Sequence, residues 1–112
     1  MTFAEYTKFV NEYDFSNGTT WYHGLGLAGE TGEVIELIKK SHRTGKRYQP
    51  INPEQLALEL GDVLWYLTRL AHMHGYNLEQ IALMNQMKLA QRKAKETNGT
   101  NSSGSVSINQ SS

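Results

Sequence analysis

The chain has 112 residues, no cysteine, 38% apolar residues and equal numbers of basic and acidic residues, 11 of each. This length allows one globular domain at most. The absence of cysteine excludes a disulfide scaffold, a thiol nucleophile and a thiolate zinc site. A net charge of zero argues against a general nucleic-acid binder, because nonspecific affinity for duplexes comes mainly from a surplus of basic residues.

The two ends of the sequence differ in composition. Residues 1–5 lack the basic-then-apolar layout of a signal peptide, and no apolar run approaches the roughly 20 residues of a membrane helix. We therefore expect a cytoplasmic protein without a membrane partner. Residues 96–112 are almost wholly Asn, Gly, Ser, Thr and Gln, which bury too little apolar area to offset their ordering entropy. The composition predicts a helical domain over 1–95 and a disordered polar tail over 96–112.

Capping signals and apolar periodicity predict two helices in the first half of the chain. Thr2 and Glu5 form a capping-box pattern that opens a helix running to about Asp14. A second apolar-periodic segment begins near Thr20 and stops at Gly45. Its start is the least defined boundary, because several glycines in this segment are poor helix formers.

Two further helices follow in the second half. Asn52 is a typical N-cap with Pro53 at the first helical position, and the apolar pattern continues to a stop at Gly75. Asn77 opens a fourth helix, which extends to about Arg92 before the composition turns polar. No strand-like alternation of useful length appears, so the sequence predicts an all-α bundle of about four helices.

Carboxylates occupy positions where these helices are otherwise apolar. At about 100° per residue, Glu30 lies within the apolar face of the second predicted helix and Glu33 at its edge. Glu59 lies within the apolar face of the third helix and Asp62 at its edge. Packing these faces together would bring four carboxylates near one point, between the two central helices. The faces comprise Leu27, Val34, Ile35, Leu37 and Ile38 in the second helix and Leu56, Leu60, Val63, Tyr66, Leu67 and Leu70 in the third.

Four partly desolvated carboxylates repel one another and need compensation to stay ionised. A divalent cation supplies it, and all-oxygen ligation suits Mg²⁺, with Mn²⁺ as a substitute, rather than zinc. The alternative is that each acid is salt-bridged or reaches water from a half-exposed face, which is the commoner state of a single Glu. Two acid pairs in matching positions favour the metal site.

Candidate substrate-binding residues lie on the fourth and second helices. Asn85, Lys88 and Arg92 form one polar stripe on the fourth helix, which suggests a phosphate site, although compensation of the helix dipole is an alternative for the two cations. Trp21 could stack on a nucleobase or pack in the core. His23, as a lone histidine, is expected to be structural.

The third helix is apolar on a second side. Leu58 and Trp65 point away from the acidic face, as expected of a helix that is buried on both sides. In a chain with so small a core, a second copy of the chain is the best cover for this face.

Three segments resemble motifs of the MazG-like nucleoside triphosphate pyrophosphohydrolases. GLGLAGETGEV over residues 24–34 and ELGDVLWYL over residues 59–67 are similar to the ExxE and ExxD motifs of that family. The block around Asn85, Lys88 and Arg92 is similar to its third motif, so the resemblance covers roughly residues 20–93.

The resemblance implies an all-α fold and hydrolysis of a (deoxy)nucleoside triphosphate to a monophosphate and pyrophosphate. It implies that Mg²⁺ is held by Glu30, Glu33, Glu59 and Asp62, which are also the catalytic candidates, and that the assembly is a homodimer or a homotetramer. Lys88 and Arg92 would stabilise phosphate charge, and Asn85 would orient a phosphate or the sugar.

Other functions remain open from the sequence. A phosphoribosyl-ATP or dUTP pyrophosphohydrolase would use the same acid pairs. A non-catalytic helical interaction module would instead carry the acids as a solvated stripe, with Leu58 and Trp65 as a partner surface.

Overall fold

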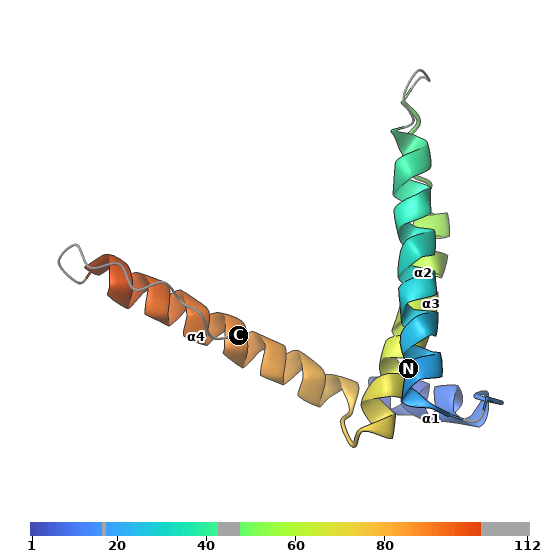
Figure 1. Cartoon of the computed structure of the whole chain (residues 1–112), viewed down its shortest axis with the longest axis horizontal. Helices are drawn as coiled ribbons and strands as arrows, with labels where there is room; N and C mark the ends of the chain where they lie inside the picture. Colours follow the sequence, from blue (N-terminus) through green and yellow to red (C-terminus); the bar gives the residue numbers. More distant parts are fainter. Residues whose placement is uncertain (17, 43–47, 102–112) are drawn as a thin grey trace. The chain divides into compact units, whose positions relative to one another are not determined.

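The computed structural model describes residues 1–16, 18–42 and 48–101 (Figure 1). Over these ranges it has four helices and no strand: α1 (Phe3–Glu12), α2 (Thr20–Ser41), α3 (Pro53–Met73) and α4 (Leu78–Asn101). The predicted all-α class is confirmed. Helices α1 to α3 belong to one unit, Met1–Asn77, and α4 opens a second unit at Leu78. Among the described residues, no helix is both long and apolar enough to span a membrane.

Side-chain caps define where α1 and α3 begin. The Thr2 hydroxyl accepts a hydrogen bond from the Glu5 backbone N–H at 3.1 Å, and the Thr2 backbone N–H donates to the Glu5 carboxylate at 2.8 Å. The Asn52 side-chain oxygen accepts from the backbone N–H groups of Glu54 and Gln55 at 3.0 and 3.2 Å. These bonds satisfy amide groups that have no partner inside the helix, so both predicted starts are confirmed.

The end of α3 is fixed by a glycine in the left-handed region. Gly75 has φ +84°, and its N–H donates to the His72 carbonyl at 3.1 Å. The Tyr76 N–H donates to the Ala71 carbonyl at 2.9 Å. This pair of bonds is the Schellman motif, which closes a helix where a side chain would be strained. The predicted stop at Gly75 is confirmed.

Other helix ends differ from the sequence expectations. Helix α1 ends at Glu12, before the predicted Asp14. Helix α2 ends at Ser41, and its predicted stop, Gly45, lies outside the described residues. Helix α4 continues to Asn101, so the first residues of the predicted disordered tail are helical. Residues 102–112 lie outside the described part of the chain.

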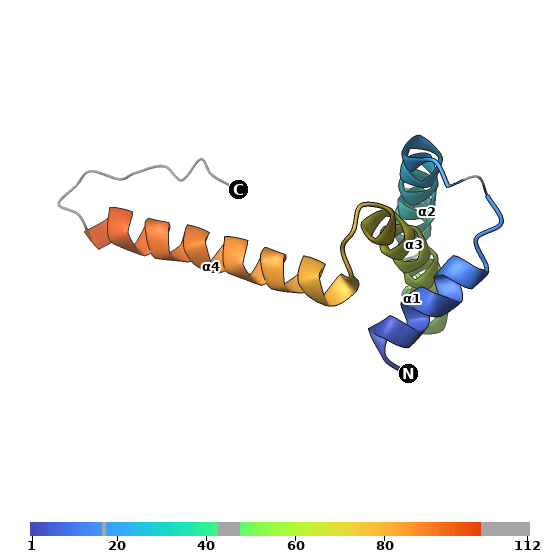
Figure 2. The ribbon, with the colours of Figure 1, turned by 90° about the horizontal axis from the view of Figure 1, so that it is seen from below.

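Helices α2 and α3 lie side by side and antiparallel, and α1 crosses one end of the pair (Figures 1 and 2). The register is visible in two contacts: Gly26 faces Tyr66, and four residues further along α2 Glu30 faces Asp62, four residues earlier on α3. The Thr20 hydroxyl lies 3.0 Å from Nε2 of His74 and joins the start of α2 to the end of α3.

The contact face between α2 and α3 is narrower than the predicted apolar faces. Four residues that the helical wheel placed in those faces are exposed in the structure, namely Ile35, Ile38, Leu60 and Leu67. The packed side of α2 runs through Val34 and Leu37, which the wheel also placed in that face and which are partly buried. Two packed helices cover only the residues nearest their line of contact. Side chains at the edges of a wide apolar face therefore stay exposed to solvent.

Candidate metal site

Three carboxylates from α2 and α3 meet on the contact face. Glu30, Glu59 and Asp62 each offer one oxygen, and these oxygens all lie within 4.8 Å of one another. Glu30 and Glu59 are partly buried, whereas Asp62 is exposed. The antiparallel register places the turn of α2 that carries Glu30 opposite the turn of α3 that carries Glu59 and Asp62. We call this cluster the acidic trio.

Glu33, the fourth predicted ligand, is not part of the trio. It is exposed, and at three residues from Glu30 it projects about 60° further around α2. Its charge nevertheless reaches the site, because it contributes to raising the pKa of Glu30. Glu33 is therefore an electrostatic neighbour of the trio in this structure, and its role as a ligand stays a prediction.

The electrostatics of the trio disfavour the ionised state of Glu30. Burial raises the pKa of this carboxyl above its ordinary value, and the negative charges of Asp62, Glu59 and Glu33 raise it further. Like charges and desolvation both penalise a carboxylate, and a nearby cation relieves both. The trio thus has the charge imbalance that a bound cation would correct.

The donor set fits a hard divalent cation. All three groups supply oxygen, which Mg²⁺ and Mn²⁺ prefer, and neither histidine nor thiolate takes part. Ligands at about 2.1 Å around an octahedral Mg²⁺ lie roughly 3.0 to 4.2 Å apart. The oxygens of the trio lie within 4.8 Å of one another, close to that spacing, and Asp62 is exposed to solvent.

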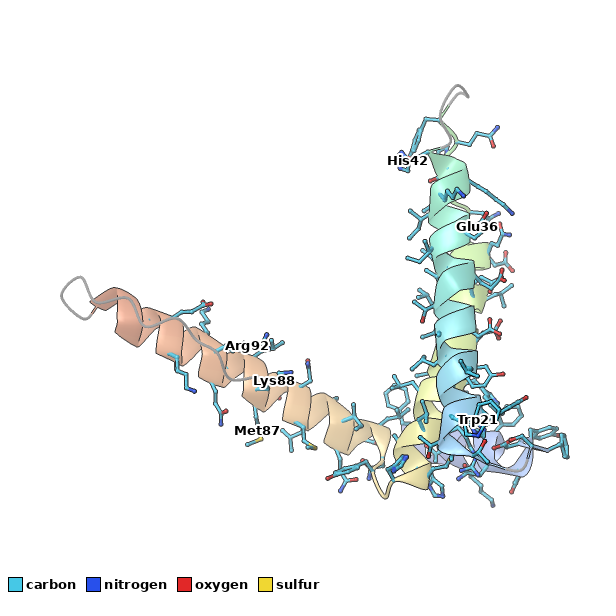
Figure 3. All side chains as sticks on the ribbon, viewed as in Figure 1. Trp21, Glu36, His42, Met87, Lys88 and Arg92 are labelled. Atoms are coloured by element: carbon cyan, nitrogen blue, oxygen red, sulfur yellow. The ribbon has the colours of Figure 1, made fainter. Side chains whose placement is uncertain are left out.

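The predicted phosphate-binding residues lie on α4, in the second unit. Their spacing places Asn85, Lys88 and Arg92 on one face of the helix. Figure 3 shows Lys88 and Arg92 on one side of α4 and Met87 on another. Lys88 and Arg92 are partly buried and Asn85 is exposed. The approach of this face to the acidic trio stays a prediction.

Trp21 lies in the first turn of α2 and is 69% exposed (Figure 3). It precedes Glu30 by nine residues, which places it roughly 180° around the helix from that carboxylate. The alternative that Trp21 packs in the core therefore does not hold within the described residues. The structure does not bring Trp21 to the acidic trio, and its contact with a nucleobase stays a prediction.

A second charged cluster lies between the end of α1 and α3. His23 is 0% exposed, and its Nε2 lies 2.9 Å from Oδ2 of Asp14, while its Nδ1 lies 2.9 Å from the Thr19 carbonyl oxygen. Arg69 of α3 donates from Nε to the same Asp14 oxygen. The structural role expected of His23 is confirmed. We call Asp14, His23 and Arg69 the buried ion cluster.

The pKa of Asp14 shows that this cluster is already compensated. Burial alone would raise that pKa, but hydrogen bonds from the Ser16 hydroxyl and backbone, from Arg69 and from His23 lower it far below its ordinary value. Sequence reasoning missed Asp14 and Arg69. The local pattern Asp14-x-Ser16 is typical of an Asx turn and could have indicated the first, but no sequence pattern links it to an arginine 55 positions away.

An all-α fold with a carboxylate cluster between two antiparallel helices defines a class, helical proteins with a candidate divalent-metal site. The profile of the MazG nucleotide pyrophosphohydrolase domain matches residues 23–96. That match covers more than half of the chain and contains both the acidic trio and the polar face of α4, so the chain belongs to the MazG family.

Known relatives agree with this assignment. The Gene 37 protein of Mycobacterium phage L5 is 39% identical over 74 residues, which are 64% of this chain and 64% of that protein. The match thus spans less than two thirds of that relative. Two crystal structures of iMazG from Vibrio DAT 722, N-tagged and C-tagged forms, are 32% identical with a TM-score of 0.56. The similarity covers 78% of this chain and 92% and 96% of those chains.

Proposed function

We propose that the protein hydrolyses (deoxy)nucleoside triphosphates to nucleoside monophosphate and pyrophosphate with the help of Mg²⁺. The observation that carries the proposal is the convergence of Glu30, Glu59 and Asp62 from two helices, within the region that matches the pyrophosphohydrolase family. Nucleoside triphosphates bind to enzymes as metal complexes. Carboxylates and phosphates repel one another, so the acidic trio suits a triphosphate only when a cation lies between them.

The acidic trio would perform the central chemistry. A divalent cation bound there would supply positive charge beside the phosphate oxygens and the attacking water. Glu30, Glu59 and Asp62 would hold it, with Glu33 as a fourth candidate ligand. A water molecule attacks the α-phosphorus, and a carboxylate of the cluster accepts its proton. The bond between the α-phosphorus and the oxygen that bridges it to the β-phosphorus then breaks. The products are the monophosphate and pyrophosphate.

Residues outside the trio would bind the rest of the nucleotide. Lys88 and Arg92 carry fixed positive charge on one face of α4 and suit phosphate oxygens, and the Asn85 amide suits a phosphate or the sugar. The exposed indole of Trp21 offers a stacking surface for a base. We further propose that residues 1–95 form the catalytic domain.

Assembly as a homodimer or a homotetramer forms part of the proposal. Leu58 is 67% exposed on α3, and a large apolar side chain on a central helix favours cover by a second copy. Trp65, on the same predicted face, is partly covered in the chain itself and lies with its ring 6.1 Å from that of His23. Light scattering of the wild type and of Leu58→Glu tests the assembly, and a monomeric wild type would contradict it.

Pyrophosphate release is the direct test. Wild type and Glu59→Gln are assayed on canonical and modified nucleoside triphosphates, dUTP and phosphoribosyl-ATP, with and without Mg²⁺. We expect metal-dependent release that falls by about 1,000-fold or more in Glu59→Gln, with unchanged helical circular dichroism, because the change removes a negative charge from the trio. Glu36→Gln is the matched control, because Glu36 is exposed on α2 and lies outside the trio (Figure 3).

Two outcomes would contradict the proposal. Full activity of Glu59→Gln would exclude the acidic trio as the catalytic site. No pyrophosphate from any compound in the panel would exclude a pyrophosphohydrolase and favour the helical interaction module. Release from phosphoribosyl-ATP or dUTP alone would narrow the substrate without moving the site.

A further inference from the structure

Gly26 differs from the other glycines of the α2–α3 pair. A Cβ built at Gly26 would lie 2.1 Å from Cε1 of Tyr66 and 2.4 Å from Cζ, far inside van der Waals contact. A Cβ would meet nothing within 4 Å at the other glycines of these two helices, namely Gly24, Gly29, Gly32 and Gly61. Glycine inside a helix is destabilising relative to alanine. At position 26 the structure explains the glycine, because the Tyr66 ring packs directly against the α2 backbone there.

This contact forms the layer next to the acidic trio. Gly26 precedes Glu30 by one helical turn on α2, and Tyr66 follows Asp62 by one turn on α3. Residues four apart are neighbours on one face of a helix. The Tyr66 ring is also held from other sides, with its centroid 5.0 Å from that of Trp65 and 6.1 Å from that of His23. These neighbours hold the ring against the backbone of α2 at Gly26.

The surroundings of the Tyr66 hydroxyl fit a hydrogen-bond donor. Burial raises the pKa of this phenol, and Tyr22 and the charges of Glu30, Asp14 and Asp62 raise it further. A tyrosine hydroxyl carries one proton that it can donate in a hydrogen bond to a carboxylate oxygen. Carboxylates that hold a metal use some of their lone pairs on the cation, and a neighbouring donor that bonds to the remaining ones fixes their orientation.

We propose that Tyr66 is a positioning residue for divalent-cation binding, seated by Gly26 so that its hydroxyl supports the carboxylates of the acidic trio. This inference rests on the proposed function, because it assumes that the trio binds a cation. Tyr66 need not touch the cation or the nucleotide, since its effect passes through the carboxylates.

Binding of Mn²⁺ to the full chain tests the proposal without an activity assay. Titration followed by electron paramagnetic resonance of free Mn²⁺ gives the dissociation constant. We expect Tyr66→Phe to weaken binding about 10-fold, which is the lower end of the effect of removing a group that orients metal ligands. The same variant keeps the aromatic ring, so its thermal unfolding temperature is expected to stay close to that of the wild type.

Gly26→Ala provides an independent route to the same effect, since the added methyl group displaces the ring from its seat. We expect a loss of Mn²⁺ affinity similar to that of Tyr66→Phe, and no further loss when the two changes are combined, because both act through one hydroxyl. Gly24→Ala is the matched control on the same helix, and we expect it to leave Mn²⁺ affinity unchanged because its Cβ enters open space.

The outcomes separate the two proposals. If the wild type binds Mn²⁺, Glu59→Gln loses it and Tyr66→Phe matches the wild type, the positioning role is wrong and the metal site stands. If the wild type itself binds no Mn²⁺, the proposed function fails at its metal site. If Gly26→Ala weakens binding while Tyr66→Phe does not, the ring acts as packing alone, which also overturns the role of the hydroxyl.

Discussion

The unit Met1–Asn77 holds two charged clusters, and the groups that surround the carboxylate differ in charge between them. In the buried ion cluster, Asp14 is surrounded by hydrogen-bond donors from the chain itself, among them the Arg69 cation, and its pKa is lowered. In the acidic trio, Glu30 is surrounded by other carboxylates, and its pKa is raised. A carboxylate with internal partners stabilises the fold, whereas one that faces like charges lacks a counter-charge from the described chain. The direction of the pKa shift thus distinguishes a structural acid from a candidate ligand.

Removing the internal partner is expected to have the largest effect on stability. Asp14→Asn would leave the Arg69 cation without its counter-charge, and breaking a buried pair in this way costs about 3 kcal/mol of unfolding free energy. Urea unfolding followed by circular dichroism measures it. Glu36→Gln, an exposed change, is expected to stay within about 0.5 kcal/mol of the wild type. Equal unfolding free energies for the two variants would remove the distinction between the clusters.

The pH dependence of stability follows from the same carboxyl group. Because the pKa of Asp14 is lower in the folded chain than in the unfolded chain, its contribution is present above the ordinary carboxyl pKa, near 4. It is lost as the pH falls below that value toward the lowered one. We expect the wild type to lose more unfolding free energy than Asp14→Asn between pH 5 and about pH 2. Parallel curves for the two proteins would show that Asp14 does not carry this dependence.

A smaller effect of opposite sign is expected in the acidic trio. Without a divalent cation, Glu30→Gln removes like-charge repulsion and should raise the unfolding free energy by a few tenths of a kcal/mol, since water screens partly exposed carboxylates. Added Mg²⁺ should stabilise the wild type more than the variant, by about 2.7 kcal/mol at a hundredfold excess over the dissociation constant if binding is lost in the variant. Equal stabilisation of both proteins by Mg²⁺ would place the cation elsewhere.

Local chemistry made much of the fold predictable from sequence. Three helix boundaries involve residues only a few positions apart: the capping box of Thr2 and Glu5, the Asn52 cap and the stop at Gly75. The local sequence is therefore sufficient to predict them. The positions of Glu30 and Glu59 on the contact face also follow from helical periodicity alone.

Features that depend on pairing between distant segments were not predictable. Nothing in a run of similar glycines distinguishes Gly26 from its neighbours, because the reason for it is the Tyr66 ring of another helix. The partnership of Asp14 with Arg69 has the same origin. The wheel placed Glu33 and Asp62 alike at the edge of their apolar faces. It could not show that Asp62 joins the trio and Glu33 does not, because the width of the helix contact depends on how the partner helix crosses.

The antiparallel pairing of α2 and α3 also bears on the order in which the clusters assemble during folding. Glu30 and Glu59 are 29 positions apart in the chain, whereas Asp14 and Arg69 are separated by 55. The entropy lost on closing a loop grows with its length, by about 0.6 kcal/mol for each doubling. A hairpin of α2 and α3 is therefore sufficient to bring the three carboxylates together, whereas the buried ion cluster also needs the segment that follows α1.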